Sequence, residues 1–335
     1  MIPCSSLWAC VSPDPLQYIR DIQQVKAKYC PTHVPNVTRR TFLKRLLWSS
    51  AIVGAGGVAY PTLIEPRFPH VRRIPLVIQG LPTAFDGLTI AHLTDLHRSR
   101  LVSSEYLSEC IATANALAPD LMVFTGDYLT VGNHLSHHHP HITRLIEFLF
   151  KETSPPAEMV HECAQCMSQS RAKYGVFASL GNHDNWYDGD AAAKVIESVG
   201  IPVLRNDSLT VRINGEPLTI VGLGDLWTDG VDVARAFRNV DSPFSLVLMH
   251  NPDSFEDWSQ PGSHLILAGH THGGQVDIPF YGPPYVPSQY GQKYAHGLFV
   301  RGDTQMYVNR GVGLIAPPVR FNCPPEIALL RLQKA

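Results

Sequence analysis

Side chains that can bind metal ions recur along the chain, each at the end of a short apolar run. In order they are Asp95, His97, Asp127, Asn182, His183, His250, His270 and His272. Asp95/His97 and His270/His272 are spaced by two residues, which in an extended chain turns both side chains to the same side. The mixture of carboxylate, imidazole and amide groups favours Mn, Fe, Zn or Co over Ca or Mg.

Glycine directly precedes three of these candidate ligands, at Gly126, Gly181 and Gly269. It permits sharp turns and a close approach of the backbone to an ion. Asp127 could bridge two ions. Two ions about 3.5–4 Å apart hold a phosphoryl group and lower the pKa of a water, so that hydroxide exists near neutral pH. The residue types are therefore compatible with two-metal chemistry on a phosphoryl group.

The elements that must position these residues are short strands. Buried strands are predicted where apolar runs end beside the candidate ligands, at residues 88–93, 121–124, 176–180, 245–249 and 264–268. Further strands are expected at residues 209–213, 218–223, 306–309 and 327–332. Helical spacing of apolar residues predicts helices at 104–117, 157–173 and 190–199, the first capped by Ser103 or Ser104. Strand–helix alternation followed by a strand-rich half indicates sheets flanked by helices.

The motifs D-x-H, G-D-x, G-N-H-D, H-N-P-D and G-H-T-H resemble those of the calcineurin-like binuclear metallophosphoesterases. They stand here at residues 95–97, 126–128, 181–184, 250–253 and 269–272. The resemblance covers about residues 74–333. It is sharpest to the bacterial phosphodiesterase branch of YaeI and YkuE, through residues 222–227, 273–275, 310–313 and 320–326.

The resemblance implies a fold and a set of roles. The fold would be a four-layer αββα arrangement of two packed mixed β-sheets flanked by helices. One divalent ion would be held by Asp95, His97, Asp127 and His272, and a second by Asp127, Asn182, His250 and His270. His183 would stay off the metals, steady the phosphoryl group and protonate the leaving oxygen, and Asp184 would orient His183.

The implied activity is hydrolysis of a phosphodiester or pyrophosphate bond by a metal-bridging hydroxide, on a phosphorylated small-molecule or lipid substrate. One candidate substrate is UDP-2,3-diacylglucosamine, of the lipid A pathway. Two alternatives remain open. One is a cell-envelope phosphodiesterase of other specificity, and the other is a metal-dependent phosphate-binding protein that does not hydrolyse its ligand.

The N-terminal part has a different character from the rest. Thr38–Lys44 resembles a twin-arginine export signal, and the uncharged residues 46–60 follow it. We therefore expect residues 38–62 to be a signal or membrane anchor, residues 1–37 an extension that a misplaced start codon would explain, and residues 63–335 the metallophosphoesterase domain. The predicted partner is the twin-arginine machinery, and the predicted location is the periplasm, cell envelope or membrane.

Charge separates these parts as well. Lys and Arg total 27 and Asp and Glu total 29 in the whole chain, with a formal net charge of −2. Seven of the basic but only two of the acidic residues lie within residues 1–60, so the remainder is acidic. An acidic body without a basic cluster argues against binding of a nucleic acid backbone.

Four features permit more than one interpretation. Cys163 and Cys166 read as small residues on a helix rather than as a zinc pair. The histidine cluster at residues 134–141 is either a solvated loop or a substrate contact. The residues Arg98, Arg310 and Arg320 are candidate phosphate clamps or structural ion-pair partners. The loop at residues 280–294 is a lid or an ordinarily packed loop.

Overall fold

The computed structural model describes Lys44, residues 56–131 and residues 149–335. The chain divides into two compact units, Met1–Gly56 and Gly57–Ala335. The predicted extension at residues 1–37, most of the predicted signal or anchor at 38–62 and the histidine cluster at 134–141 lie outside the described residues. Among the helices that are described, none has the length and apolar character to cross a membrane.

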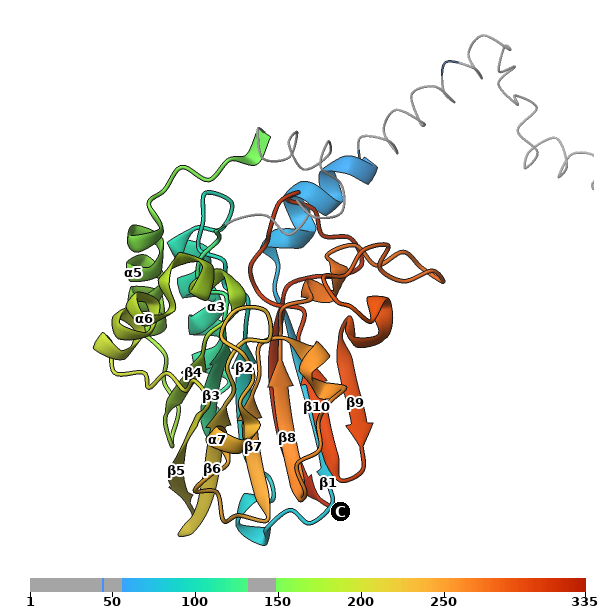
Figure 1. Ribbon diagram of the computed structural model, residues 1–335. Coiled ribbons are helices and arrows are strands. Elements are labelled where there is room, and N and C mark those ends of the chain that lie inside the picture. The colour runs from blue at the N-terminus through green and yellow to red at the C-terminus, as the bar shows by residue number, and fades with distance from the viewer. Residues whose placement is uncertain (1–43, 45–55, 132–148) are drawn as a thin grey trace, which may run out of the picture. The chain divides into compact units, whose positions relative to one another are not determined.

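Two mixed β-sheets form the centre of the second unit (Figure 1). The five-stranded sheet has the order β1-β11-β2-β3-β4. Its strands are β1 (His70–Ile78), β2 (Thr89–Leu93), β3 (Leu121–Thr125), β4 (Val176–Ser179) and β11 (Glu326–Lys334). The six-stranded sheet has the order β5-β6-β7-β8-β10-β9. Its strands are β5 (Asp207–Ile213), β6 (Glu216–Gly222), β7 (Phe244–Leu248), β8 (Ser263–Ala268), β9 (Gly297–Arg301) and β10 (Thr304–Val308).

Strand direction places the chemistry-bearing residues together. Strands β2, β3 and β4 run parallel, and so do β6, β7 and β8. Parallel strands that are neighbours in a sheet end at the same edge, so the segments that follow them meet there. The candidate ligands all follow strands of these two parallel groups.

Alternate residues of each strand face different layers. In β3, Leu121 and Val123 join the core between the sheets, whereas Met122 and Phe124 face the helices. The helices on that outer face are α3 (Ser104–Ala116), α5 (Pro156–Met167) and α6 (Asn182–Ser198). Short segments cover the other sheet, and the short helices of the unit are α7 (Val233–Ala236), η1 (Tyr60–Ile64), η2 (Glu65–Arg67), η3 (Thr83–Phe85), η5 (Pro252–Phe255), η6 (His272–Gly274) and η7 (Gly291–Tyr294).

The architecture confirms the predicted fold class, two mixed sheets flanked by helices. Ser103 is the N-cap of α3, and its side chain accepts the Tyr106 backbone amide. Two predicted helix boundaries were wrong. Helix α5 ends at Met167 instead of 173, and α6 begins at Asn182 instead of 190, with extended backbone at Asp188 (φ −174°) dividing it. The first part of α6 is polar and has no apolar periodicity to announce it.

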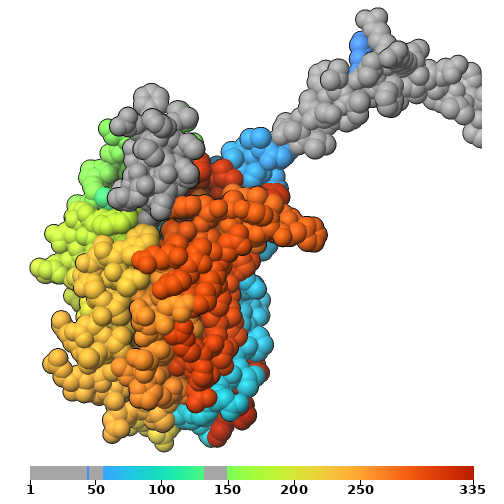
Figure 2. Space-filling view, turned by 45° about the vertical axis from the view of Figure 1, so that its right-hand side comes forward, coloured from blue at the N-terminus to red at the C-terminus, as the bar shows by residue number. Residues whose placement is uncertain are grey.

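The segment between η6 and η7 projects from the surface, in orange in Figure 2. Phe280 in this segment is fully exposed, and Tyr281 is 64% exposed. The base of the segment is anchored, because the Ser288 hydroxyl and the Gln289 amide both donate to the carboxylate of Asp253. The lid interpretation of this segment stays a prediction.

Candidate metal centre

Every predicted ligand is buried and lies just beyond the carboxyl end of a strand. Asp95 and His97 follow β2, Asp127 follows β3, Asn182 and His183 open α6 after β4, His250 follows β7, and His270 and His272 follow β8. Five of them have left-handed backbone, with φ between +48° and +70°: Asp95, His97, Asp127, His270 and His272. Such conformations cost about 1–3 kcal/mol each and concentrate at functional sites, where the surrounding structure enforces them.

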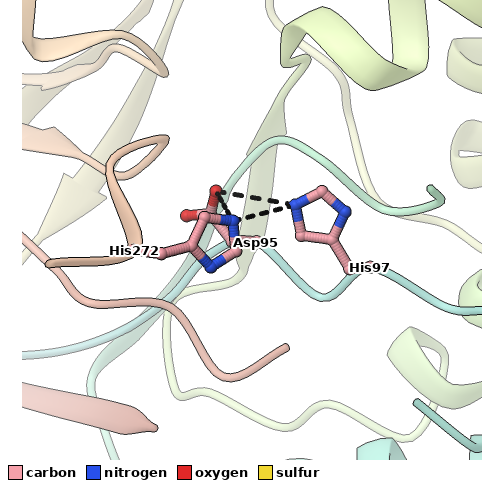
Figure 3. Close-up of side chains that lie close together, drawn as sticks. All are labelled: Asp95, His97 and His272. Atoms are coloured by element: carbon pink, nitrogen blue, oxygen red, sulfur yellow. Dashed lines mark hydrogen bonds and ion pairs between the residues drawn. The ribbon is translucent and has the colours of Figure 1, made fainter. Parts of the chain in front are cut away.

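The first group of ligand atoms consists of Asp95, His97 and His272 (Figure 3). Nε2 of His272 lies 3.3 Å from Oδ1 of Asp95 and 3.0 Å from Nε2 of His97. Nε2 of His97 is 4.0 Å from Oδ1 of Asp95. Three donor atoms that converge in this way from two loops, the one after β2 and the one after β8, can hold one cation.

The second group consists of Asp127, His250 and His270. Nε2 of His250 lies 3.2 Å from Oδ2 of Asp127 and 3.2 Å from Nδ1 of His270. The amide oxygen of Asn182 is 3.2 Å from the same His250 nitrogen. This oxygen adds a fourth possible ligand to the second group.

Asp127 lies between the two groups. Its Oδ2 is 3.5 Å from Nε2 of His97 in the first group and 3.2 Å from Nε2 of His250 in the second. Its Oδ1 accepts the backbone amide of His183 at 2.9 Å, which fixes the carboxylate. Oδ2 is buried and satisfied by no hydrogen-bond donor among the described residues. An acceptor held in this way suits a carboxylate that two cations share.

The imidazoles are oriented by contacts on their far nitrogens. Nδ1 of His250 is 2.6 Å from the carbonyl oxygen of Thr125, so it carries the proton and donates to that oxygen. Nδ1 of His97 is 3.1 Å from the Thr130 hydroxyl. Contacts of this kind fix the ring and leave Nε2 with a lone pair toward the centre, as metal-binding histidines require.

His183 has the opposite arrangement. Its Nδ1 accepts the backbone amide of Val131 at 3.0 Å, so in the neutral ring the proton sits on Nε2. Burial lowers the pKa of His183 to about 3, although the charge of Asp127 acts to raise it. His183 is therefore a neutral hydrogen-bond donor. His183 lies close enough to His97 and Asp127 to bind the same ion. It is unsuited to do so because its Nε2 carries a proton and has no free lone pair.

Asp184 uses its carboxylate on the backbone of two loops. Oδ2 accepts the amides of Asp127 and Gly181, and Oδ1 accepts the amide of Tyr128, each at 2.8 Å. These bonds join the loop after β3 to the loop after β4. Orientation of His183 by Asp184 stays a prediction.

The charges of the centre call for a cation. Burial, with repulsion from Asp127, raises the pKa of Asp95 to about 7. Burial acts to lower the pKa of His250, but Asp127, Asp95 and Asp225 raise it to about 10. The buried carboxylates therefore need positive charge beside them, which protons or a metal ion can supply. When a metal ion binds, it displaces protons from its ligands. The donor set fits two divalent ions.

Only glycine fits at two positions beside the ligands, because there is no room for a side chain. A Cβ on Gly181 would lie 2.2 Å from Oδ1 of Asp127 and 2.8 Å from Cε1 of His250. A Cβ on Gly269 would lie 2.3 Å from Oδ2 of Asp95. The close approach that the sequence predicted is therefore present at both positions.

The structure assigns structural contacts to two of the three candidate phosphate clamps. Arg320 is fully buried, and its guanidinium donates to the backbone carbonyls of Arg310, Gly311, Gly313 and Cys323. Arg98 pairs with Glu162 at 2.7 Å. For Arg310, whose Nη2 lies 3.3 Å from His296, the clamp role stays a prediction.

The interpretation of Cys163 and Cys166 as helix residues is confirmed. Both are buried on α5 and are free cysteines.

Sequence reasoning gave no role to three residues that lie at this centre. Asp225 is 1% exposed, and its charge acts on His250. The indole of Trp186 packs edge-on against His183, and that of Trp227 against His270. Asp225 and Trp227 stand in the stretch 222–227 that sharpened the resemblance, whereas nothing in the sequence marked Trp186.

The fold and the centre together define a metal-dependent phosphoesterase, and a family model described as calcineurin-like phosphoesterase matches residues 88–274. The chain belongs to this family and is a hydrolase of phosphoric ester bonds. Its relatives include the uncharacterized metallophosphoesterase YkuE of Bacillus subtilis (strain 168), with 33% identity over 89% of this chain and 98% of YkuE.

Two further relatives have more specific names. Phosphodiesterase YaeI of Escherichia coli (strain K12) is 31% identical over 88% of this chain and 99% of YaeI. UDP-2,3-diacylglucosamine pyrophosphatase LpxG of Chlamydia muridarum (strain MoPn / Nigg) is 25% identical over 78% of this chain and 90% of LpxG. The similarity to YaeI and YkuE confirms the predicted branch.

Proposed function

We propose that the chain hydrolyses a phosphodiester or pyrophosphate bond with two divalent ions, drawn from Mn, Fe, Zn and Co. The observation that carries the proposal is the position of Asp127, whose Oδ2 faces His97 on one side and His250 on the other. Bound ions would supply Lewis-acid charge that polarises the phosphoryl group and lowers the pKa of water.

The residues would divide the work as follows. Asp95, His97, Asp127 and His272 would hold one ion, and Asp127, Asn182, His250 and His270 the other. His183 would donate a hydrogen bond from its Nε2–H to the phosphoryl or leaving oxygen. The Val131 amide on Nδ1 and the pKa of about 3 favour this hydrogen bond from the neutral ring over transfer of a proton from an imidazolium.

The relatives' names support two substrate classes. YaeI is named as a phosphodiesterase and LpxG as a pyrophosphatase of UDP-2,3-diacylglucosamine. Identity is higher to YaeI and covers nearly all of it, so a phosphodiester is the first class to test. UDP-2,3-diacylglucosamine is the second. A wall polymer or another envelope diester belongs to the first class.

The test is hydrolysis of bis-p-nitrophenyl phosphate by the purified chain, with and without Mn²⁺, beside the monoester p-nitrophenyl phosphate. We expect metal-dependent cleavage of the diester that Asp127→Asn abolishes. The matched control is Asp120→Asn, because Asp120 binds the backbone of Thr89 at the opposite end of β3. Equal hydrolysis by Asp127→Asn would contradict the shared-ligand role. A chain that binds two ions but cleaves neither these compounds nor UDP-2,3-diacylglucosamine would favour the non-hydrolytic alternative.

We also propose export by the twin-arginine route, with the protein in the periplasm or cell envelope or attached to the membrane. The support is the sequence Thr38–Lys44 and the uncharged stretch after it. Replacement of Arg39 and Arg40 by Lys should retain the protein in the cytoplasm, as measured by cell fractionation. Unchanged export of this variant would contradict the proposal.

A further inference from the structure

Two indole rings stand at the rim of the metal centre. The ring centroid of Trp186 is 4.8 Å from that of His183, and the ring centroid of Trp227 is 4.4 Å from that of His270. The two indoles are 6.5 Å apart and nearly parallel, with 23° between their planes. They come from α6 and from the loop after β6, which are 41 positions apart in the chain.

These indoles are held in place by the contacts of their neighbours. Nδ2 of Asn185, next to Trp186, donates to the hydroxyl of Thr228, next to Trp227, at 2.9 Å. That hydroxyl and the Trp227 amide both donate to the buried carboxylate of Asp225. The pair is therefore positioned before any ligand arrives, which lowers the entropic cost of binding.

A second bridge joins the same two elements. Arg205 pairs with Asp190 on α6 at 2.6 Å and with Asp229 on the loop at 2.8 Å. Arg205 therefore also links α6 to the loop that carries Trp227.

The indoles are partly exposed, unlike the residues they pack against. Trp186 is 41% exposed and Trp227 is 37% exposed, whereas His183 and His270 are each 1% exposed. By comparison, Trp258 is 7% exposed and packs in the core. Large apolar surface beside a polar reaction centre is typical of a ligand subsite, since apolar walls with a few polar groups make small-molecule sites.

We propose that Trp186 and Trp227 form a stacking subsite for a planar ring carried by an ester group of the substrate, as in a nucleotide. This inference rests on the proposed function and names the substrate class. Ring faces favour a flat partner, and aromatic stacking accepts every base because each has a π-face. A ring bound there lies within one nucleotide of the phosphorus, because the indoles touch His183 and His270 of the centre itself.

Binding tests the inference without turnover. Thymidine 5′-monophosphate and methyl phosphate are titrated into the Mn²⁺-loaded protein by calorimetry. We expect Trp186→Ala and Trp227→Ala to lower the affinity for thymidine monophosphate by about 5- to 100-fold, which is the range measured for loss of one stacked base. Methyl phosphate should bind these variants and the wild type alike. The Phe variants should retain part of the affinity.

Two controls sharpen the result. Tyr174→Ala removes an aromatic ring just before β4, at the end of that strand away from the metal centre, and should leave the binding of both compounds unchanged. Octyl phosphate offers a flexible apolar chain in place of a flat ring. If the Ala variants lose affinity for octyl phosphate and thymidine monophosphate equally, the indoles form a general apolar surface and the stacking subsite is overturned. Unchanged binding of thymidine monophosphate in both Ala variants would also overturn it.

Turnover separates this inference from the proposed function. The substrates are thymidylyl-thymidine and glycerophosphoglycerol, diesters with and without rings. The wild type should favour the first in kcat/KM, and the Ala variants should reduce that preference by about 5- to 100-fold. Hydrolysis of both diesters with the same preference in all variants would overturn the subsite alone. No hydrolysis with intact ring-dependent binding would overturn the proposed function alone.

Discussion

The carboxylate of Asp184 accepts the backbone amide of Asp127 at 2.8 Å. The same oxygen accepts the amide of Gly181, and its other oxygen accepts Tyr128. Asp184 therefore holds the residue that both ligand groups share. Asp184→Asn keeps one acceptor oxygen and turns the other into a donor, which would face a backbone amide. We expect metal affinity to fall by about 10- to 100-fold, the usual effect of losing a contact behind a ligand, as measured by metal titration.

His183→Ala is the matched variant for that experiment. His183 is not expected to bind metal, so its removal should lower kcat and leave metal affinity unchanged. If Asp184→Asn instead copied His183→Ala, with full metal affinity and low kcat, then Asp184 would act through His183, as the sequence predicted.

Substitution of Arg320 tests whether this residue has a structural role or binds the phosphate of the substrate. Its side chain is fully buried, with four backbone carbonyls as acceptors. A buried acceptor left without its hydrogen-bond donor costs about 1–3 kcal/mol. We therefore expect Arg320→Gln to lower the free energy of unfolding in urea by about that amount, with an unchanged KM in the fraction that stays folded. A raised KM at normal stability would show that the guanidinium binds substrate.

The strands that carry the ligands were predictable because they are buried on both faces. Every residue of β3, β7 and β8 is buried, and such strands read as continuous apolar runs. The two strands that were missed, β1 and β9, lie at sheet edges. Strand β1 contains Arg72, Arg73 and Pro75, and an edge strand tolerates both charge and proline.

The centre was predictable for a different reason. Ligand side chains have a residue type that the sequence displays, and their order matched a known family. The contacts of the Thr125 carbonyl with His250 and of the Val131 amide with His183 are made by backbone groups. Every residue has such groups, so the residue types do not predict these contacts. The pairing of Trp186 with Trp227 depends on how α6 packs beside the loop after β6, and that is tertiary information.

His92 should make stability depend on pH. It is fully buried, and burial lowers its pKa from 6.5 to about 3. The unfolded chain therefore takes up a proton at a higher pH than the folded one. The stability from neutral His92 is complete above about pH 6.5 and is lost as pH falls toward 3, by about 2 kcal/mol at pH 5.

His92→Gln removes that titration and can keep the contact with the Thr125 hydroxyl, which is 2.8 Å from Nε2 of His92. Urea unfolding at pH 7 and pH 5 should show a smaller loss in this variant than in the wild type. His183 has a similar pKa, so part of the loss should persist. The exposed His161→Gln should behave as the wild type, and an equal loss in His92→Gln would contradict the assignment.

Chelation should destabilise the protein, because the centre gathers charge that only a cation or protons can balance. Asp95 and Asp127 lie with His97, His250 and His272 in one buried cluster. A ligand that binds only the folded state adds about 2.7 kcal/mol at 100 times its Kd. For a chain of this size that is a rise of about 4–5 °C in Tm per site. Scanning calorimetry after EDTA treatment, and again after Mn²⁺ is restored, measures the difference. Asp127→Asn should lose most of the response because both ligand groups share Asp127, whereas Asp120→Asn should keep it. A Tm that ignores both EDTA and Mn²⁺ would mean that the cluster binds no cation in the folded state.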